Sequence, residues 1–418
     1  MWIFDKDLWD EVFSTLSKNL LRTLLTTLGV IFAIIILILL LGASTGMSNG
    51  FNKMFAGTAT NSMFMWTEST TIPYKGFERG RQVQFSLEDV EFIKKQIKEI
   101  DIISPRIQLG DYGETATVTR EGNTSGSSVY GDYPTIDQVS KKRIVEGRFL
   151  NQNDIDESKK VCVIGLDAYK LLFKKGEKAI GKSIQINGIY FSVIGVFKKN
   201  DNINFEGENA VFVPFTTFQK AFGSGDKIGW MAIVIDKSHT VAVAETKIKK
   251  LLKRKYNIHP DDPRAIGSFD LSQIFTGISM FTIVLQGFSF FVGIFTLLAG
   301  VIAVSNILLI TVKERTNEIG VRRALGATPR VIKRQIILES VVLTVFAGMI
   351  GFVISMAILH FLDNKFGNSE DFPFVNPTVG IPQLIFSFIL MIGLSTIIGL
   401  IPANRAVKIR PIEALREE

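Results

Sequence analysis

Four long apolar stretches constrain what this chain can fold into. The first has no charged residue from Thr23 to Asn52, and its centre from Leu24 to Ala43 is nearly unbroken. A helix of about 20 apolar residues crosses a hydrocarbon core of about 30 Å. The other stretches are 271–312, 335–362 and 381–402. The sequence therefore predicts a polytopic α-helical membrane protein with four transmembrane helices.

The first stretch is not a secretory signal peptide, because it is longer than a typical signal-peptide core, acidic residues precede it, and further spans follow. Hydrophobic residues make up 47% of the chain and charged residues 21%, so the apolar residues gather in blocks with soluble-like sequence between them. The net charge of +7 comes largely from Lys and Arg beside these blocks. It reflects membrane topology, and no nucleic-acid partner is expected.

The second stretch is too long for one membrane crossing. As a single helix, 271–312 would extend about 63 Å, roughly twice the thickness of a hydrocarbon core. Part of it must therefore be broken or project beyond the membrane. We expect its more polar start, from Ser272 to Ser279, to project.

Basic residues near the spans predict the orientation of the chain. Lys and Arg are frequent before the first span, between the second and third spans, and after the fourth, whereas the short loop 363–380 holds only Lys365. Cytoplasmic loops carry the excess of basic residues. We therefore expect both termini and the loop 313–334 in the cytoplasm, and 47–270 outside.

The predicted segments follow from these spans. They are a cytoplasmic interfacial helix 1–22, a transmembrane helix 23–46, an extracytoplasmic domain with stalk 47–270, a stalk and transmembrane helix 271–312, a cytoplasmic coupling loop 313–334, a transmembrane helix 335–362, a short extracytoplasmic loop 363–380, a transmembrane helix 381–402 and a cytoplasmic tail 403–418. The first helix is predicted to lie in the membrane interface, because its apolar residues share one helical face. A short packed helix without lipid contact is the alternative that the sequence leaves open.

The large extracytoplasmic segment has the pattern of an α+β domain. Leu87 to Ile100 and Val241 to Tyr256 have helical periodicity. Runs rich in Val, Ile and aromatic residues predict strands at Val161 to Gly165, Ser183 to Asn187, Tyr190 to Phe197, Ala210 to Pro214 and Met231 to Ile235. Asn187-Gly188 predicts a hairpin between two of them. The weakly apolar segment 111–133 is expected to form exposed strands and loops, a contact surface whose partner the sequence does not indicate.

Residues Gly176 to Ser183 fit the phosphate-loop pattern of Gly, four residues and Gly-Lys-Ser. A nucleotide site needs a strand before this loop and a helix after it, so that backbone N–H groups surround the phosphates. Here a helix-like run precedes, a hairpin follows, and the predicted topology places the loop outside the cell. We therefore expect Gly181 at a turn before a strand, and an ATPase on this chain is the weakest function considered.

No other pattern predicts a catalytic, cofactor-binding or metal site. Cys162 is the only cysteine, which excludes an internal disulfide, and it is expected to be a small core residue. His239, His259 and His360 are isolated in the sequence. Glu339 is near one end of the third span, and we expect it at the membrane interface near helix-start donors.

The loop between the second and third spans carries the most specific motif. Its sequence NILLITVKERTNEIGVRRALGATPRVIKRQIILES resembles the MacB/FtsX family of ABC permeases, a type VII mechanotransmission family. The family pattern Glu-Arg-x-x-Glu-Ile-Gly-x-x-Arg-Ala-x-Gly-Ala is occupied here by Glu314, Arg315, Glu318, Ile319, Gly320, Arg323, Ala324, Gly326 and Ala327. The stretches NLLRTLLTTLGV, EGRFL, IGKSIQINGIYFSVIGVF and IPANRAVKIRPIEALR extend the resemblance along the chain. Unlike MacB itself, this polypeptide is expected to lack a fused ATPase domain.

The resemblance implies a permease subunit in the plasma membrane, the inner membrane of a bacterium, that serves export or envelope transport. A cytoplasmic ABC ATPase dimer would bind ATP and Mg, so no cofactor is expected on this chain. A second permease copy, identical or not, would pair with this one, and helical stalks would transmit motion outward. A periplasmic adaptor and an outer-membrane duct are further partners that the resemblance allows. The alternative is an FtsX-like transducer that regulates a cell-wall enzyme and moves no solute.

The coupling loop is expected to dock on the ATPase. Its predicted helix, 316–325, places apolar residues beside Arg322 and Arg323, and Gly326 can end it. An ordinary positive-inside loop explains the charges but not the placement of glycine and alanine. The predicted docking residues are Glu314, Arg315, Glu318, Ile319, Gly320, Arg322, Arg323, Leu325 and Gly326.

Overall fold

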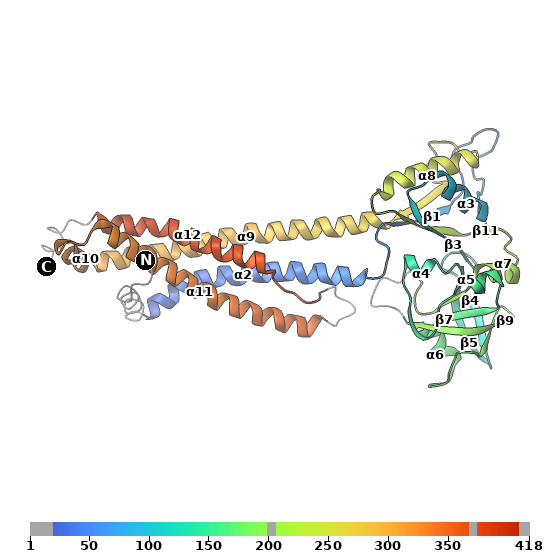
Figure 1. Ribbon diagram of the computed structural model, residues 1–418, viewed down its shortest axis with the longest axis horizontal. Helices are drawn as coiled ribbons and strands as arrows, with labels where there is room; N and C mark the ends of the chain where they lie inside the picture. Colours follow the sequence, from blue (N-terminus) through green and yellow to red (C-terminus); the bar gives the residue numbers. More distant parts are fainter. Residues whose placement is uncertain (1–19, 199–205, 368–373, 409–418) are drawn as a thin grey trace. The chain divides into compact units, whose positions relative to one another are not determined.

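The computed structural model describes residues 20–198, 206–367 and 374–408. The chain forms two compact units, a helical unit of residues 1–51 with 279–418 and an extracytoplasmic-type unit of residues 52–278 (Figure 1). Most of the predicted interfacial helix 1–22 and of the tail 403–418 lies outside the described residues.

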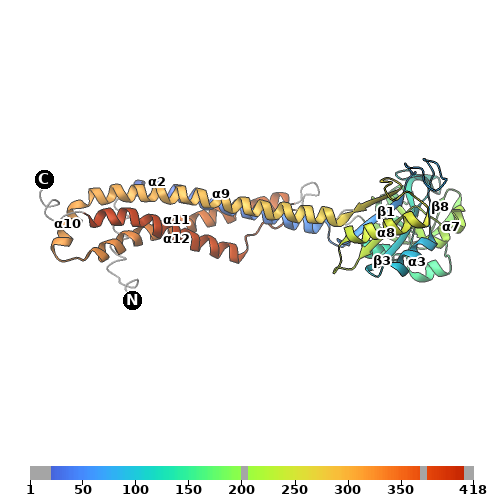
Figure 2. The ribbon, with the colours of Figure 1, turned by 90° about the horizontal axis from the view of Figure 1, so that it is seen from above.

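The helical unit contains α2 (Leu20–Met54), most of α9 (Leu271–Glu314), α10 (Thr316–Ala324), α11 (Pro329–Phe366) and α12 (Ile381–Val407). In the part of the chain that the structure describes, four helices are long and apolar enough to cross a membrane. They are α2, α9, α11 and α12, which run side by side in Figures 1 and 2. The predicted four transmembrane helices, with the large domain between the first and second, are therefore confirmed.

Helix α9 is continuous over 44 residues, which corresponds to about 66 Å. Of the two alternatives that the sequence leaves open, a broken helix or a projecting one, the structure has the unbroken helix. No residue forces a break in this helix, because it contains no proline and no two adjacent glycines. One helix of this length exceeds the hydrocarbon core about twofold.

The helices pack through one face of α2 and through small polar residues. The buried residues of α2 recur every three or four positions, at Val30, Ala33, Ile34, Leu37, Ile38 and Leu41. Ser340 and Thr344 on α11 each contact the Ser395 hydroxyl on α12 at 3.0 Å. Such small hydroxyl residues let transmembrane helices approach closely and satisfy one another's polar groups.

The second unit is built around an 11-stranded sheet with the order β10-β7-β9-β8-β4-β5-β3-β12-β1-β13, in which β6 also pairs with β9. Its strands are β1 (Ser62–Thr67), β3 (Ile100–Gln108), β4 (Ala116–Arg120), β5 (Asn123–Asp132), β6 (Arg143–Gly147), β7 (Val161–Gly165), β8 (Ser183–Ile186), β9 (Ile189–Lys198), β10 (Ala210–Pro214), β12 (Trp230–Ile235) and β13 (Ile266–Asp270). A small second sheet pairs β2 (Phe85–Ser86) with β11 (Lys227–Ile228). The helices are α3 (Leu87–Gln96), α4 (Ile136–Val139), α5 (Gln152–Asp156), α6 (Leu166–Leu172), α7 (Phe215–Phe222) and α8 (Val241–Lys255).

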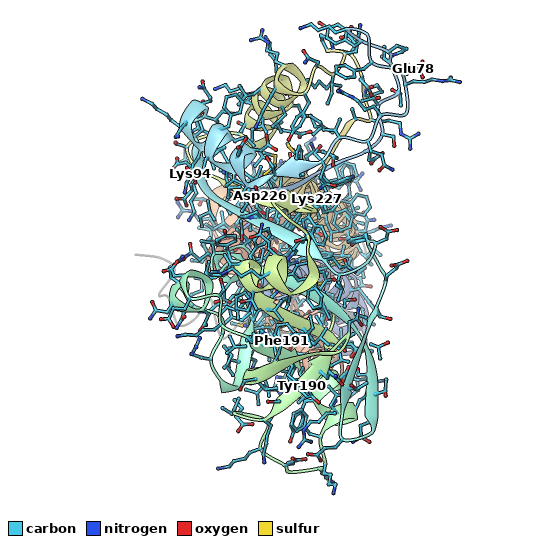
Figure 3. All side chains as sticks on the ribbon, turned by 90° about the vertical axis from the view of Figure 1, so that its right-hand side faces the viewer. Glu78, Lys94, Tyr190, Phe191, Asp226 and Lys227 are labelled. Atoms are coloured by element: carbon cyan, nitrogen blue, oxygen red, sulfur yellow. The ribbon has the colours of Figure 1, made fainter. Side chains whose placement is uncertain are left out.

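The predicted strands and hairpin of this unit are confirmed. Strands β8 and β9 pair antiparallel around Asn187 and Gly188, which both have positive φ values, at 42° and 87°. Strand β9 alternates between the core and the surface, since Phe191 is fully buried and Tyr190 is exposed (both labelled in Figure 3). This alternation is the period-two pattern on which the strand prediction rested.

The expectation that 111–133 is an exposed surface is wrong for β5. This strand pairs with β4, β3 and β10, and Ser127, Val129 and Asp132 are fully buried. Ser125 and Ser127 are buried, and Asn209 accepts hydrogen bonds from their hydroxyls at 3.1 and 3.2 Å. At Gly131 an added Cβ would lie 2.7 Å from Phe218, so a small residue is required there. Polar and small residues here reflect close packing, not exposure.

The loop that matches the phosphate-loop pattern is a mostly exposed turn in which only Ala179 is buried. Helix α6 precedes it and β8 follows it. The Gly181 N–H donates to the Val193 carbonyl at 2.8 Å, and the Lys182 N–H donates to the Ala179 carbonyl at 3.0 Å. These N–H groups are therefore unavailable to a phosphate. The predicted turn before a strand is confirmed.

A buried ion network ties the strands of this unit together. The Arg106 guanidinium on β3 donates to both carboxylate oxygens of Asp132, at 2.6 and 2.8 Å, and to Glu206 at 2.6 Å. The Lys142 ammonium donates to the other Glu206 oxygen at 2.7 Å. Burial would raise the pKa of the Glu206 carboxyl, but Lys142 and Arg106 outweigh it and lower that pKa to about 2. Glu206 is therefore ionised throughout the physiological pH range.

Candidate functional site

The site predicted from the sequence lies where α9, α10, α11 and α12 meet at one end of the helical unit. Helix α9 ends at Glu314, and α10 follows after Arg315. Gly326 has a φ of 101°, and α11 begins at Pro329 after the N-cap Thr328. Left-handed glycine ends a helix at little cost, and proline suits the first helical turn. The predicted short helix and its glycine stop are confirmed.

The apolar residues of α10 face two different ways. Ile319 packs against the cluster of Val312, Ile332, Ile336, Ala403 and Ala406. Leu325, in contrast, is 84% exposed, and Val321 is also exposed. The three residues therefore do not form one exposed apolar face. Because Ile319 is held between helices of its own chain, a substitution there would disturb the fold as well as any docking.

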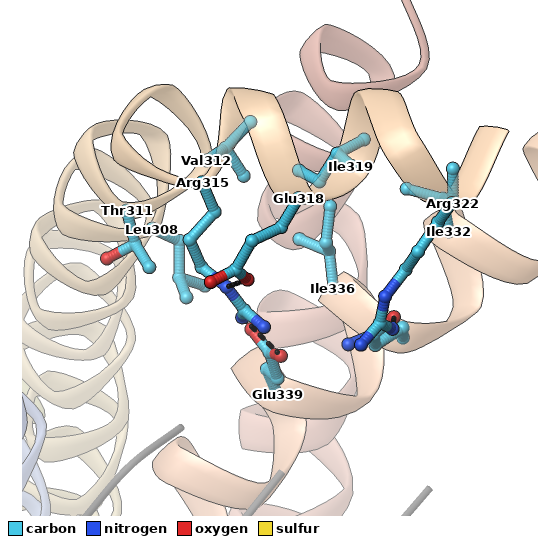
Figure 4. A pocket seen from close by; sticks show the side chains of 11 residues that line it. Leu308, Thr311, Val312, Arg315, Glu318, Ile319, Arg322, Ile332, Ile336 and Glu339 are labelled. Carbon is cyan, nitrogen blue, oxygen red and sulfur yellow. Dashed lines mark hydrogen bonds and ion pairs between the residues drawn. The ribbon is translucent and has the colours of Figure 1, made fainter. Parts of the chain in front are cut away.

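One side chain joins the start of α10 to α11. The Arg315 Nε lies 2.9 Å from the Glu318 carboxylate, and its Nη1 lies 3.4 Å from the Glu339 carboxylate (Figure 4). Glu339 is only 3% exposed. It is also about three turns beyond Pro329, where α11 begins. The expectation that Glu339 lies near helix-start donors is therefore wrong, and Arg315 is its charged partner.

Two further arginines hold α10 against its neighbours. The Arg322 Nη1 lies 3.4 Å from the Gln335 amide oxygen on α11. The Arg323 Nη1 donates to the Val407 carbonyl at 2.7 Å, at the last residue of α12. A cation beside the final carbonyls of a helix also interacts favourably with the helix dipole. Helix α10 is thus attached to both α11 and α12.

The structure brings only some of the predicted residues together. Arg315, Glu318, Ile319 and Arg322 line one small hollow of ≈ 30 Å³ with residues of α9 and α11 (Figure 4). Gly320 is buried, whereas Glu314, Leu325 and Gly326 are exposed elsewhere on the loop. The sequence interpretation missed Gln335 and Val407 as partners of the arginines. An acid in an apolar span beside an arginine-rich loop was the available signal for the Arg315 and Glu339 pair.

The described residues contain no group of three or more His, Cys, Asp or Glu side chains that could hold a metal ion. Cys162 is fully buried on β7. Burial raises the pKa of its thiol, so it stays protonated and is a packing residue.

Comparison with known proteins identifies the relatives of both parts of the chain. Residues 23–251 match the MacB-like periplasmic core domain. Residues 290–411 match the FtsX-like permease C-terminal region. The second match includes α10 and every residue that lines the hollow.

Two curated proteins and one solved structure represent these similarities. The uncharacterized ABC transporter permease YvrN of Bacillus subtilis is 33% identical over 313 residues, covering 73% of this chain and 74% of that protein. The macrolide export ATP-binding/permease protein MacB of Bdellovibrio bacteriovorus is 28% identical and covers 82% of this chain, which spans about half (51%) of that protein. The crystal structure of the periplasmic region of MacB from Actinobacillus actinomycetemcomitans is 22% identical, with a TM-score of 0.43, and covers 54% of this chain and 95% of that chain.

Proposed function

Because this chain belongs to the MacB/FtsX-like family of ABC transporter permeases, we propose that it couples ATP hydrolysis by a separate ATPase to movement of its extracytoplasmic domain, in export or envelope transport. It is a multi-pass inner-membrane protein, and its family implies an ATPase partner. The orientation, the separate ATPase chain and the direction of transport are part of the proposal.

The exposed side chain of Leu325 is the observation that carries the docking part of this proposal. It is 84% exposed at the end of α10, whereas Arg322 and Arg323 on the same helix contact α11 and α12. An exposed leucine on a well-anchored helix suits insertion into a groove on a partner. Central, desolvated contacts usually carry most of the energy of an interface. We therefore assign the docking centre to Leu325 and Val321, not to Ile319.

The substitution Leu325→Asp tests this assignment. A charge in a desolvated interface centre should weaken binding of the ATPase by about 30-fold or more, equivalent to about 2 kcal/mol. The matched control is Leu171→Asp, which places the same charge at an exposed leucine of α6 in the other unit. ATPase co-purification is measured at equal membrane levels of both variants. Wild-type co-purification of Leu325→Asp would remove the docking role from this end of α10.

A second permease copy is part of the proposal, supported by the surface of α9. Exposed residues recur on this helix at intervals of three and four, at Phe281, Val284, Phe288, Phe291 and Phe295. This spacing is that of a seam between two supercoiled helices. A lipid-facing side of a helix has the same spacing, so cross-linking is needed to distinguish a partner helix from lipid.

Cysteine cross-linking distinguishes a seam from a lipid-facing surface. In a Cys162→Ser background, Phe288→Cys should form an interchain disulfide on oxidation. Ile283→Cys is the control, because the two residues are similarly exposed, at 58% and 63%, but about 140° apart around the helix. Equal cross-linking of both variants, or of neither, would contradict the seam.

The proposed orientation is tested by labelling with a membrane-impermeant thiol reagent. In the same background, Lys237→Cys in the large domain should react in intact cells, or in spheroplasts where an outer membrane blocks access. Arg330→Cys, which is exposed at the start of α11, should react only after the membrane is opened. The reverse result would invert the topology.

A periplasmic adaptor, an outer-membrane duct and the signalling alternative stay expectations, and the permease relatives do not favour signalling.

A further inference from the structure

Glu339 is a buried carboxylate within a transmembrane helix. Its side chain is 5% exposed, and its neighbours in the hollow include Leu308, Val312 and Ile336. An ionised carboxylate in such surroundings is costly unless a partner compensates its charge. Arg315 provides that compensation at 3.4 Å.

Arg315 stands at the only residue between α9 and α10, which end and begin at Glu314 and Thr316. Its guanidinium contacts Glu318 on α10 and Glu339 on α11 at the same time (Figure 4). This side chain therefore links α10 to α11. The apolar lining lowers the local dielectric constant, which strengthens the attraction between the charges.

The geometry of this contact is that of a loose ion pair, not of a tightly fixed one. Strong arginine and carboxylate pairs have distances below about 3 Å and are often bidentate. The Arg315 side chain is 24% exposed and reaches Glu339 through one nitrogen at 3.4 Å. The contact can shorten or lengthen while attraction persists.

We propose that Glu339 is a positioning residue of the docking helix. Through Arg315 it sets the angle of α10 against α11, so that displacement of the exposed end of α10 reaches the membrane helices. This inference rests on the proposed function, in which α10 docks on an ATPase. Glu339 itself does not contact the ATPase.

The test uses the full permease in complex with its ATPase, reconstituted in lipid. A fluorophore on Lys237→Cys, in the Cys162→Ser background, reports ATP-dependent movement of the large domain. Glu339→Gln should retain the ATPase and leave the KM for ATP unchanged, but reduce the amplitude of the ATP-dependent signal roughly tenfold. Glu339→Asp, which keeps the charge, should restore most of that amplitude. Glu318→Gln changes an exposed partner of the same guanidinium and should have a much smaller effect.

Each outcome of this experiment either supports or overturns the proposal. A wild-type signal in Glu339→Gln overturns it, and so does loss of the ATPase from this variant, because Glu339 would then belong to the docking surface. If Glu339→Gln does not accumulate, the double variant Arg315→Gln/Glu339→Gln decides, since it leaves no unpaired buried charge. A normal signal in the double variant, or its failure to accumulate, refutes a positioning role. Failure of the proposed function has a different signature, an ATPase that stays bound to Leu325→Asp.

Discussion

Each unit of this protein contains an arginine that joins several elements, and the two arginines are paired in different ways. In the sheet unit, Arg106 makes three contacts of 2.6 to 2.8 Å with Asp132 and Glu206, and all three side chains are at most 3% exposed. In the helical unit, Arg315 makes contacts of 2.9 and 3.4 Å and is 24% exposed. In the first arrangement all three charges are buried and paired at short distances, whereas in the second Glu339 is buried but Arg315 is partly exposed and Glu318 is exposed.

The Arg106 network is a rigid part of the sheet unit, whereas the contact of Arg315 with Glu339 can adjust. Moving any member of the Arg106 network exposes a buried charge, so the strands β3 and β5 and the segment before β10 are held together. If Arg315 moves away from Glu339, it can keep its contact with the exposed Glu318, but buried Glu339 loses a compensating charge, which limits the movement to small displacements. A unit that must move as one body benefits from the first arrangement, and a helix that must transmit small displacements benefits from the second.

The largest effect is expected from Glu206→Gln in the sheet unit. This change leaves the positive charges of Lys142 and Arg106 less compensated in a buried site. Removing one partner from a buried ion network costs about 3–5 kcal/mol. Urea unfolding of the purified chain, followed by tryptophan fluorescence to which Trp230 beside Arg106 contributes, should show this loss.

A matched control separates burial from charge in that experiment. Glu157→Gln removes a carboxylate whose side chain is 63% exposed and whose partner Lys159 lies 3.3 Å away. Exposed pairs contribute about 0–1 kcal/mol. Similar unfolding free energies for Glu206→Gln and the control would contradict the rigid framework.

The second prediction concerns acid. Because the pKa of Glu206 is lowered from 4.5 to about 2, its ionised form stabilises the fold above pH 4.5, and this contribution disappears as the pH falls toward 2. The difference in unfolding free energy between the wild type and Glu206→Gln should therefore shrink by on the order of 3 kcal/mol across this window. Urea titrations at several pH values measure it. A difference that stays constant with pH would show that the carboxylate charge does not stabilise this unit.

The sequence was sufficient wherever a structure is specified by neighbouring residues. Helix length follows from uninterrupted apolar runs, which is why the four spans were predicted. The β8–β9 hairpin follows from Asn187-Gly188, because both residues tolerate positive φ. The C-terminal end of α10 is predicted from Gly326, because glycine also tolerates positive φ. These features depend on local backbone preferences, so no tertiary information was needed.

The sequence was insufficient where partners are distant. Arg106 and Glu206 are 100 positions apart, and Arg315 and Glu339 are 24 apart. Only the assembled sheet and helices bring these charges together. Ile319 shows the same limit, because helical periodicity groups apolar residues without indicating which face meets α11. Strand β5 was misjudged because its polar residues are satisfied by Asn209 and Arg106, which a local pattern does not reveal.

The smallest effect is expected from Glu318→Gln, and its salt dependence extends the comparison to both units. The Glu318 side chain is 59% exposed, so its pair with Arg315 should contribute less than about 1 kcal/mol. At 1 M salt the Debye length falls to about 3 Å, which screens exposed charges but affects buried ones much less. The small destabilisation should therefore vanish at 1 M salt, whereas the effect of Glu206→Gln should persist.

Trypsin cleavage after Arg322 or Arg323 reports the opening of α10 when opening is fast relative to cleavage. A large, salt-resistant increase in cleavage for Glu318→Gln would mean that the pair is a fixed element of the fold, and the distinction between the two units would then fail.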